Sequence, residues 1–452
     1  MPKEPWKPRE FIYEFTDEDL TASAGLGPLI DLFCASPQFA ALAKCLPERR
    51  SNASFDTTQF ALSLLSGFWY GHDCLDDLEE FEGDPGVEEK LEDLPSARAV
   101  GDWLRDFTPE HLEKLNRFLT KQALSCRKQL ASDAPLTIDI DSTAHEQSGQ
   151  KMEGLAFNYD GKWCLDSLVA FDELGLGYRM DLRPGNTFSA NGSPAMIDAI
   201  FSNLDFKAEK HFRGDSAFCS EDMIRTCLAK GAKFTITAHG NTGWEGQVPE
   251  ITSWVPWAFS AEEQEKAASR KSFLPKIELG SFLYQPGWSE NLRFFCVVKR
   301  TWVEGEDLFG QGHWKYYAVL TNRNLLYQSL QSVMEHHAKR GNSENFIREE
   351  KYGYDLKHFP CQKLSANHAY GLLALIAHNF LRTIARLHRP DKPHYAKKLR
   401  RQFIFLPGKL VKHARQLVMK IPRRFQKEVL LIREWTRAAT LSTALALSPP
   451  GS

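Results

Sequence analysis

Two aspartates alternate along the apolar stretch Leu136–Thr143 (LTIDIDST). In an extended strand successive side chains point to opposite faces, so Ile138 and Ile140 share one face, and Asp139 and Asp141 share the other. Two acids at the end of a strand suit the binding of a cation or a proton. Alternating acids more often face solvent, so for this stretch taken alone a solvated strand face is the favoured interpretation.

Two later segments each add one carboxylate. Arg213–Phe218 (RGDSAF) contains Asp215, and Arg340–Tyr352 (RGNSENFIREEKY) contains Glu344. Three acids from separate segments supply the oxygen ligands that Mg²⁺ prefers. In a two-metal phosphoryl-transfer site, two ions about 3.5 to 4 Å apart hold the attacking and leaving oxygens. We predict that Asp141 bridges two Mg²⁺ ions, for which Mn²⁺ would substitute, and that Asp215 and Glu344 hold one ion each.

A long helical region expected over residues 325–351 positions the third acid. At about 100° per residue, Arg340, Glu344 and Lys351 fall within roughly 40° of one another. A metal ligand flanked by two cations would suit contact with DNA phosphates. The alternative is a solvated face with an i,i+4 pair, and the Gly341–Asn342 dipeptide can also end one helix before the next begins. Helix phase alone favours the solvated face.

The composition indicates a soluble protein. The chain has 452 residues, of which 42% are hydrophobic and 25% charged, which is ordinary for a protein with a large core and several domains. Its nine cysteines form no CxxC pair, so neither a zinc site nor a disulfide framework is indicated. No window approaches the roughly twenty apolar residues of a membrane span, and the first residues lack a signal-sequence core. We expect a cytoplasmic protein.

Charge is segregated along the chain, although the formal net charge is -2. Residues 73–93 hold eleven acids against one lysine, whereas residues 382–437 hold seventeen Lys and Arg against three acids. Cations interleaved with apolar side chains suit salt-dependent, sequence-independent contact with a phosphate backbone. A solvated helix surface is the alternative, but mutual repulsion among so many cations favours nucleic acid. The side chains predicted to contact DNA are Lys397, Lys398, Arg400, Arg401, Arg423 and Arg424.

The remaining sequence predicts the elements that position these residues. Residues 57–130 show helical periodicity with capping signals, which is equally compatible with a DNA-binding domain and with a plain helical bundle. From Leu136 onward strands alternate with helices, which predicts a mixed sheet covered by helices. Residues 240–313 depart from this alternation, with two strong strands and five tryptophans. They predict a β-rich insertion.

The chain therefore divides into five predicted parts with an overall α/β fold. These are a helical N-terminal DNA-binding or dimerisation domain (1–130), the first part of the α/β core (131–239), the β-rich insertion (240–313), the second part of the core (314–388) and a basic helical C-terminal region (389–452).

The motifs DIDST, RGDSAF and Arg340-x3-Glu344-x6-Lys351 follow one another in this order, and LRPGNTFSANG, TNRNLLYQS and SANHAYGLLALIAHN accompany them. Together they resemble the DDE transposases of bacterial insertion sequences, in particular the IS1380 family within the IS4-like group and its Y-x2-R-x3-E-x6-K signature. The resemblance covers most of the chain. His337 occupies the tyrosine position of the signature, a departure that affects the expected contact with a terminal phosphate and leaves the metal site untouched.

The resemblance implies an RNase H-like catalytic core, a mixed sheet flanked by helices, with Asp141, Asp215 and Glu344 as catalytic residues and metal ligands. It also implies that Arg340 and Lys351 contact phosphates near the cleaved bond. Asp139 is the competing first acid. Asp141 is preferred because the aspartate of the family directly precedes a Ser/Thr pair.

The activity implied is DNA transposition, in which activated water cuts at the insertion-sequence ends and the freed 3' hydroxyl attacks target DNA. Pairing of two ends implies a homodimer on double-stranded DNA, associated with the nucleoid of a bacterial cell. Trp254, Trp257, Trp288 and Trp302 are candidates to stack a flipped base, with core packing as the alternative for each. A silent DNA-binding derivative and an endonuclease without strand transfer are the competing functions.

Overall fold

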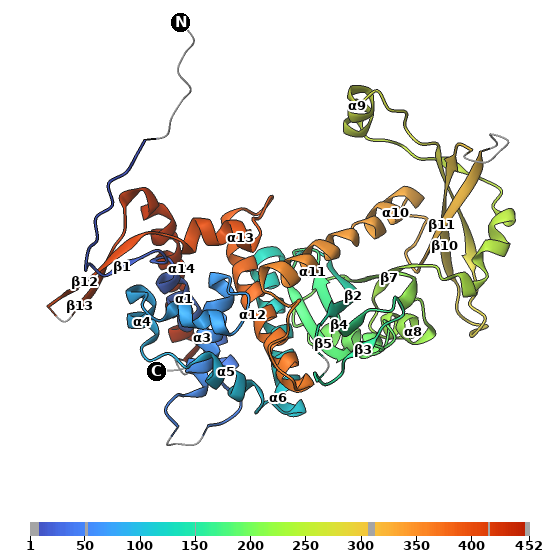
Figure 1. Ribbon diagram of the computed structural model, residues 1–452. Coiled ribbons are helices and arrows are strands. Elements are labelled where there is room, and N and C mark those ends of the chain that lie inside the picture. Colours follow the sequence, from blue (N-terminus) through green and yellow to red (C-terminus); the bar gives the residue numbers. More distant parts are fainter. Residues whose placement is uncertain (1–8, 50–52, 150, 306–311, 415, 448–452) are drawn as a thin grey trace, which may run out of the picture.

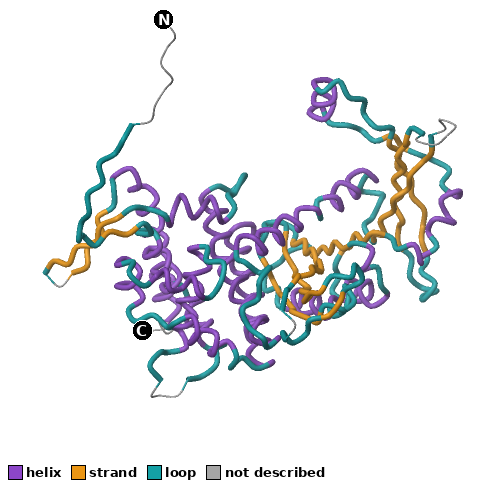
Figure 2. The backbone as a smooth tube through the Cα atoms, in the orientation of Figure 1, coloured by secondary structure: helices purple, strands orange, loops and turns teal. Residues whose placement is uncertain are grey.

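The computed structural model describes residues 9–49, 53–149, 151–305, 312–414 and 416–447. A helical body, a mixed sheet covered by helices and a lobe of long strands follow one another across the molecule (Figure 1). Figure 2 shows that helices dominate at one end and strands at the other. Among the described residues no single helix is long and apolar enough to cross a membrane, and one bent helix pair, Leu26–Ala35 with Pro37–Ala43, passes that test by length and composition.

The helical body is built from both ends of the chain. Its apolar core is continuous from the first helices to the long helix α12, so the terminal segments stabilise one another. Capping boxes at Asp56 and Thr108 define the starts of α3 and α6. The elements of the body are α1 (Leu26–Ala35), α2 (Pro37–Ala43), α3 (Thr57–Tyr70), η1 (Asp76–Phe81), α4 (Pro85–Leu91), α5 (Ala97–Leu104), α6 (Pro109–Ala131), α12 (Leu364–His388), α13 (Ala396–Leu399), η6 (Arg423–Phe425) and α14 (Gln426–Leu447).

The central sheet contains ten strands within the described residues. Its strands read as apolar, β-branched runs and bury both faces at the centre, where β2 and β4 lie. The strands are β2 (Leu136–Glu146), β3 (Ala156–Phe157), β4 (Trp163–Asp172), β5 (Gly177–Pro184), β6 (Lys210–Gly214), β7 (Lys233–Thr237), β8 (Val255–Pro256), β9 (Ile277–Tyr284), β10 (Phe294–Val303) and β11 (His313–Thr321).

The sheet is mixed, because β2, β6 and β7 are parallel to one another while β4 runs antiparallel to β2 and β5 antiparallel to β4. Helices α7 (Ser193–Ser202) and α8 (Glu221–Ala229) connect β5 to β6 and β6 to β7. On the other side α6 and α12 pack against β5. The prediction of an α/β fold with a large mixed sheet flanked by helices is confirmed.

The strands of the predicted insertion continue the central sheet. β11 pairs with β10 along its whole length but with β7 only from Val319 to Thr321. The order β7-β11-β10-β9-β8 therefore carries the sheet outward into the lobe seen in Figure 1. Helix α9 (Ala261–Ser269) lies beyond these strands and buries none of its residues.

The helix expected over residues 325–351 is two helices. α10 (Leu330–Ala338) ends before Lys339, and α11 (Gly341–Gly353) begins after Arg340. The break lies next to the Gly341–Asn342 dipeptide, as the alternative interpretation of the sequence anticipated. Arg340 precedes the first turn of α11, which carries Glu344. The relation of Arg340 to Glu344 therefore comes from one helical turn and not from a long continuous helix.

The C-terminal region is not wholly helical, which corrects the sequence-based expectation. β12 (Gly408–His413) and β13 (Gln416–Lys420) form a hairpin that pairs with β1 (Leu20–Thr21) of the N-terminal segment. Lys412 of this hairpin forms an ion pair with Glu89 of the acidic stretch. Cations and apolar residues do not alternate along 408–420, so the sequence offered no strand period for this hairpin.

Arg400 tests whether the basic region also serves packing. Its guanidinium donates to the carbonyls of Trp69 (2.9 Å) and Phe68 (2.8 Å) and to that of Gly353. We predict that Arg400→Met lowers the free energy of unfolding by about 2 to 4 kcal/mol, because three buried carbonyls lose a charged donor. The neighbouring exposed Arg401 provides the control, and Arg401→Met should change stability by less than about 0.5 kcal/mol. Chemical denaturation followed by circular dichroism measures both; equal effects would contradict the packing role.

Candidate active site

The register of two parallel strands brings the first two acids together. β2 and β6 are aligned so that Asp139 lies opposite Arg213, the last registered pair. Asp141 and Asp215 each follow two residues later, where β2 leaves the interior and β6 ends. Carboxyl ends of parallel strands lie at the same edge of a sheet, which is the usual place for ligands in α/β folds. Both aspartates line one cavity.

Asp139 and Arg213 form a buried ion pair. The guanidinium donates from Nε and Nη2 to the two carboxylate oxygens at 2.7 and 2.6 Å, and the two side chains are 1% and 2% exposed. Burial raises the pKa of Asp139 to about 6, while Arg213 opposes that rise. A carboxylate with both oxygens occupied in the interior has a structural role. The structure therefore favours Asp141 as the acid that faces the cavity.

Asp141 is only partly compensated. Its Oδ1 accepts a hydrogen bond from the backbone nitrogen of Ser142 at 2.9 Å, and its Oδ2 lies 3.5 Å from the nearest nitrogen of Arg340. Burial raises the pKa of Asp141 to about 6, and the negative charges of Asp215 and Glu344 add to this rise against the effect of Arg340. The three predicted acids are therefore close enough to repel one another.

Arg340 lies between two of the acids. Its second terminal nitrogen is 3.9 Å from the carboxylate of Glu344, which is 67% exposed and free to change rotamer. Asp215 caps the short helix η2 (Ser216–Phe218) by accepting from the backbone nitrogen of Ala217 at 2.8 Å. Arg340 therefore partly neutralises the charges of Asp141 and Glu344.

The cavity that Asp141 and Asp215 line has a volume of about 940 Å³. Its wall also includes the turn from Gly185 to Ser189, within the Pro/Gly segment singled out in the sequence. Lys351, which lies in the last turn of α11, reaches this cavity and donates to the carbonyl of Ala144 at 2.7 Å. Burial lowers the pKa of Lys351. The cavity therefore combines acids and a cation, as a site for a phosphodiester and its counter-ions would.

A hydrogen-bonded network supports the cavity floor. Asp166 of β4 accepts from the hydroxyl of Ser142 at 2.6 Å and from Nε of Arg183 at 2.8 Å. Arg183 also donates to the carbonyl of Asn191 at 2.5 Å. These contacts fix the strand beyond Asp141 and the turn that follows β5.

The carboxylates fit a hard divalent cation in donor type, since all of their ligand atoms are oxygen. Across the described residues, however, no group of three or more His, Cys, Asp or Glu side chains is arranged to hold a metal ion. Asp141 and Asp215 already share the cavity, and the exposed Glu344 is the side chain that would have to approach. The pKa of Asp141 is raised first by burial and then by the charges of Asp215 and Glu344, and a bound cation would oppose this rise.

His337 does not face a surface where DNA could bind. It is 3% exposed, and its Nε2 lies 3.0 Å from the hydroxyl of Thr237. Burial lowers its pKa to about 4, so the ring is neutral near pH 7. This corrects the expectation of a phosphate contact at His337. Tyr317, whose hydroxyl lies 2.9 Å from the same Thr237 hydroxyl, feels the charges of Arg340 and Asp215, and the sequence analysis did not select it.

The four candidate tryptophans lie in or near the outer strands. The ring of Trp254 stacks with Arg300 at 3.9 Å, and that of Trp288 with Arg225 at 4.9 Å. Trp257 packs partly buried against a small apolar cluster of the lobe, and Trp302 is 36% exposed beside Trp314. Each ring already has a partner.

The predicted basic residues of the C-terminal region fall into two groups. Arg400 is 7% exposed and serves packing, which corrects its assignment to DNA. The exposed cations Lys397, Lys398 and Arg401 line a second, larger cavity, and Arg423 and Arg424 are exposed on η6. Arg382, Arg386 and Arg389 line that cavity too, and the sequence analysis did not select them individually. Their spacing of four and seven residues along α12 was the available signal.

Asp141 and Asp215 follow two neighbouring parallel strands of the sheet, and Glu344 lies in the first turn of α11. Residues 5–443 match the family model described as transposase DDE domain group 1. The chain belongs to this transposase family, and the match spans nearly its whole length. No curated protein matches the sequence.

Asp141 makes a pH-dependent contribution to stability. Burial raises its pKa from the ordinary 3.8 to about 6 in the folded chain, so the folded state holds the proton more tightly and stability falls as pH rises from about 4 to 6. We predict that Asp141→Asn is more stable than the native chain at pH 8, by roughly 2 to 3 kcal/mol, and that the difference shrinks at pH 5. Thermal unfolding in EDTA at both pH values measures this. A constant difference would contradict the raised pKa.

Substitution of Asp139 should have the opposite effect, although burial raises the pKa of Asp139 as well, because the buried Arg213 depends on this carboxylate. We predict that Asp139→Asn lowers the free energy of unfolding by about 3 to 5 kcal/mol, because it leaves the buried Arg213 charge without its partner. Denaturation at pH 8 provides the measurement, with Asp141→Asn as the matched control two residues away. Similar effects of the two substitutions would show that the structural and cavity-facing roles have been assigned wrongly.

Proposed function

We propose that this transposase cuts DNA at insertion-sequence ends and joins the 3' hydroxyl to target DNA by two-metal phosphoryl transfer. The observation that carries the proposal is that Asp141 and Asp215 line one cavity at one edge of the sheet, while Arg340 lies between Asp141 and Glu344. The negative charges of Asp215 and Glu344 add to the rise in the pKa of Asp141. Proteins retain such charge where a function needs it.

The order β5-β4-β2-β6-β7 supports an RNase H-like core. In this order the antiparallel β4 lies between two strands that run in the same direction, and two further parallel strands follow β2. The first acid then lies on the central strand and the second after its parallel neighbour. Membership of the IS1380 family within the IS4-like group stays a prediction.

The roles follow from chemistry at the cavity. Divalent cations, Mg²⁺ with Mn²⁺ as a substitute, would supply an activated water and neutralise charge on the transferred phosphoryl group. Asp141 and Asp215 would provide oxygen ligands from fixed strands, and Glu344 would provide one from a helix turn. Arg340 and Lys351 flank this set and stabilise the phosphodiester electrostatically. Because Arg340 now lies near Asp141 and Glu344, DNA binding would draw it toward a phosphate.

DNA contact beyond the cavity involves the exposed cations of the C-terminal region and the tryptophans of the lobe. Trp254 and Trp288 each lie against an arginine, so a flipped base would stack there only by displacing or sharing that cation. Two transposon ends must be paired, and a homodimer on double-stranded DNA is the expected assembly. The same site would serve an endonuclease without strand transfer, which differs only in the fate of the 3' end.

Cleavage of a labelled duplex carrying the element's own end sequence tests the proposal. We predict cutting with Mg²⁺ and none with Ca²⁺, and a loss of at least about a hundredfold in Glu344→Gln with DNA binding retained. Glu335→Gln, an exposed substitution of the same type on α10, is the control and should cut normally.

Binding without cleavage by the native chain would instead identify a silent DNA-binding derivative. Cleavage that persists in Glu344→Gln would remove Glu344 from the site. Joining of the cut end to a second duplex separates a transposase from an endonuclease.

A further inference from the structure

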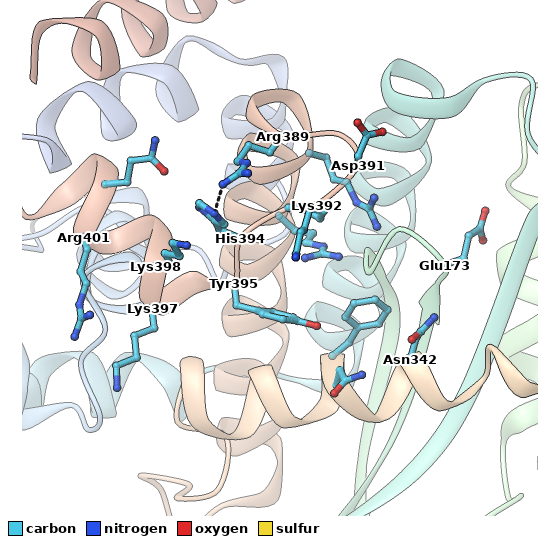
Figure 3. A pocket seen from close by; sticks show the side chains of 16 residues that line it. Glu173, Asn342, Arg389, Asp391, Lys392, His394, Tyr395, Lys397, Lys398 and Arg401 are labelled. Atoms are coloured by element: carbon cyan, nitrogen blue, oxygen red, sulfur yellow. Dashed lines mark hydrogen bonds between the residues drawn. The ribbon is translucent and has the colours of Figure 1, made fainter. Parts of the chain in front are cut away.

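A second cavity, of about 1140 Å³, lies between α11, α12 and α13. Its lining contains seven Lys and Arg side chains and two acids. Figure 3 shows Lys397, Lys398 and Arg401 on the side away from Glu173, with Tyr395 between them. The cavity is therefore strongly basic.

The two acids do little to neutralise these cations. Glu173 is engaged elsewhere, since its carboxylate accepts from Arg127 at 2.7 Å and from the backbone nitrogen of Thr137 at 3.2 Å. Within the part of the chain that the structure describes, none of the seven cations forms an ion pair with an acid. Seven cations that enclose one space repel one another unless an anion enters.

Arg382 provides a buried hydrogen-bond donor in the wall of the cavity. It is 5% exposed and lines the cavity, and its Nη1 is buried with no hydrogen-bond partner. Its Nε donates to the carbonyl of Leu174 at 2.8 Å, and its guanidinium lies against the rings of Phe346 (5.1 Å) and Tyr395 (5.7 Å). A buried guanidinium nitrogen without an acceptor is costly, and a planar donor fork is suited to phosphate. The side chain is held in place while one donor stays free.

The cavity adjoins the candidate active site through α11. Asn342 and Asn345 line it, and they flank Glu344 by two residues and by one residue on the same helix. Their amides are neutral donors suited to phosphate oxygens. At about 100° per residue Asn342 and Asn345 lie on another face of α11 than Glu344, so a DNA strand that reaches Glu344 would pass around α11 to this basic surface.

We infer that this cavity binds the sugar-phosphate backbone of the DNA beyond the candidate active site, with Arg382 as its buried phosphate ligand. The inference rests on the proposed function, because it takes DNA as the substrate. Each strand of duplex DNA carries one phosphate per about 3.4 Å of helix axis, so more than one phosphate can approach such a cavity. DNA binding in the cavity is independent of base sequence, because its lining offers cations that contact phosphates and forms no pocket for base edges.

The test compares DNA binding by the full chain and by two double variants as KCl is raised from about 50 to 300 mM, in Ca²⁺. Lys392→Gln with Lys398→Gln removes two exposed cations of the cavity. Lys128→Gln with Lys207→Gln removes two exposed cations elsewhere and keeps the net charge equal. Fluorescence anisotropy uses the terminal-end duplex and a scrambled duplex of the same length.

We expect the salt slope to fall by about two in the cavity variant, by the same amount on both duplexes, and to stay unchanged in the control. Equal slopes in the two variants would overturn the inference. Tripolyphosphate provides a second arm. If calorimetry detects tripolyphosphate binding that the cavity variant loses, while the same variant binds DNA like the native chain, the site serves a free polyphosphate and the DNA assignment is wrong.

The outcomes separate this inference from the proposed function. A native chain that binds DNA with the expected change in slope but does not cut it supports the cavity and contradicts the catalytic proposal. A native chain that cuts DNA while both variants keep the native slope supports the catalytic proposal and contradicts the inference about the cavity.

Discussion

The buried ion pair between Asp139 and Arg213 fixes the geometry on which the candidate site depends. Arg213 holds Asp139 of the neighbouring strand with two nitrogens, and with the third it donates to the carbonyl of His336 at 2.8 Å. One guanidinium therefore joins β2, β6 and the end of α10. These are the segments that precede Asp141, Asp215 and Glu344 respectively. Loss of either partner leaves a buried charge unpaired and frees all three acids at once.

This constraint explains why neighbouring acids have different roles. Asp139 and Asp141 lie two residues apart on one face of β2, yet Asp139 lies where the strand is flanked by β6, and Asp141 lies where β6 has ended. The first is saturated by an arginine. The second is exposed to the repulsion of two other acids, with Arg340 as a weak and movable partner. The pair of Asp139 with Arg213 contributes to stability, and Asp141 remains available for binding.

The sequence predicted the sheet well, because its strands carry a clear apolar period and their ends carry Gly, Pro or acidic residues. It could not predict that β11 joins the lobe to the core, since that pairing depends on the register of residues 319 to 321 against β7. It also assigned Arg400 and His337 to a DNA surface. Arg and His have the same sequence signal whether they donate to buried carbonyls or to phosphates, and only burial separates the two.

The same argument applies to the basic C-terminal region, whose cations meet three different environments. Lys409 and Lys412 are paired with Glu18 and Glu89 of the helical body, so part of the charge segregation is neutralised within the fold. Arg400 is buried and donates to backbone carbonyls. The cations of the second cavity have no acid partner within the described residues, although acids are plentiful elsewhere on the chain, and Arg382 and Arg386 donate to the carbonyl of Leu174. Seven cations around one space repel one another, and an external anion would relieve that repulsion.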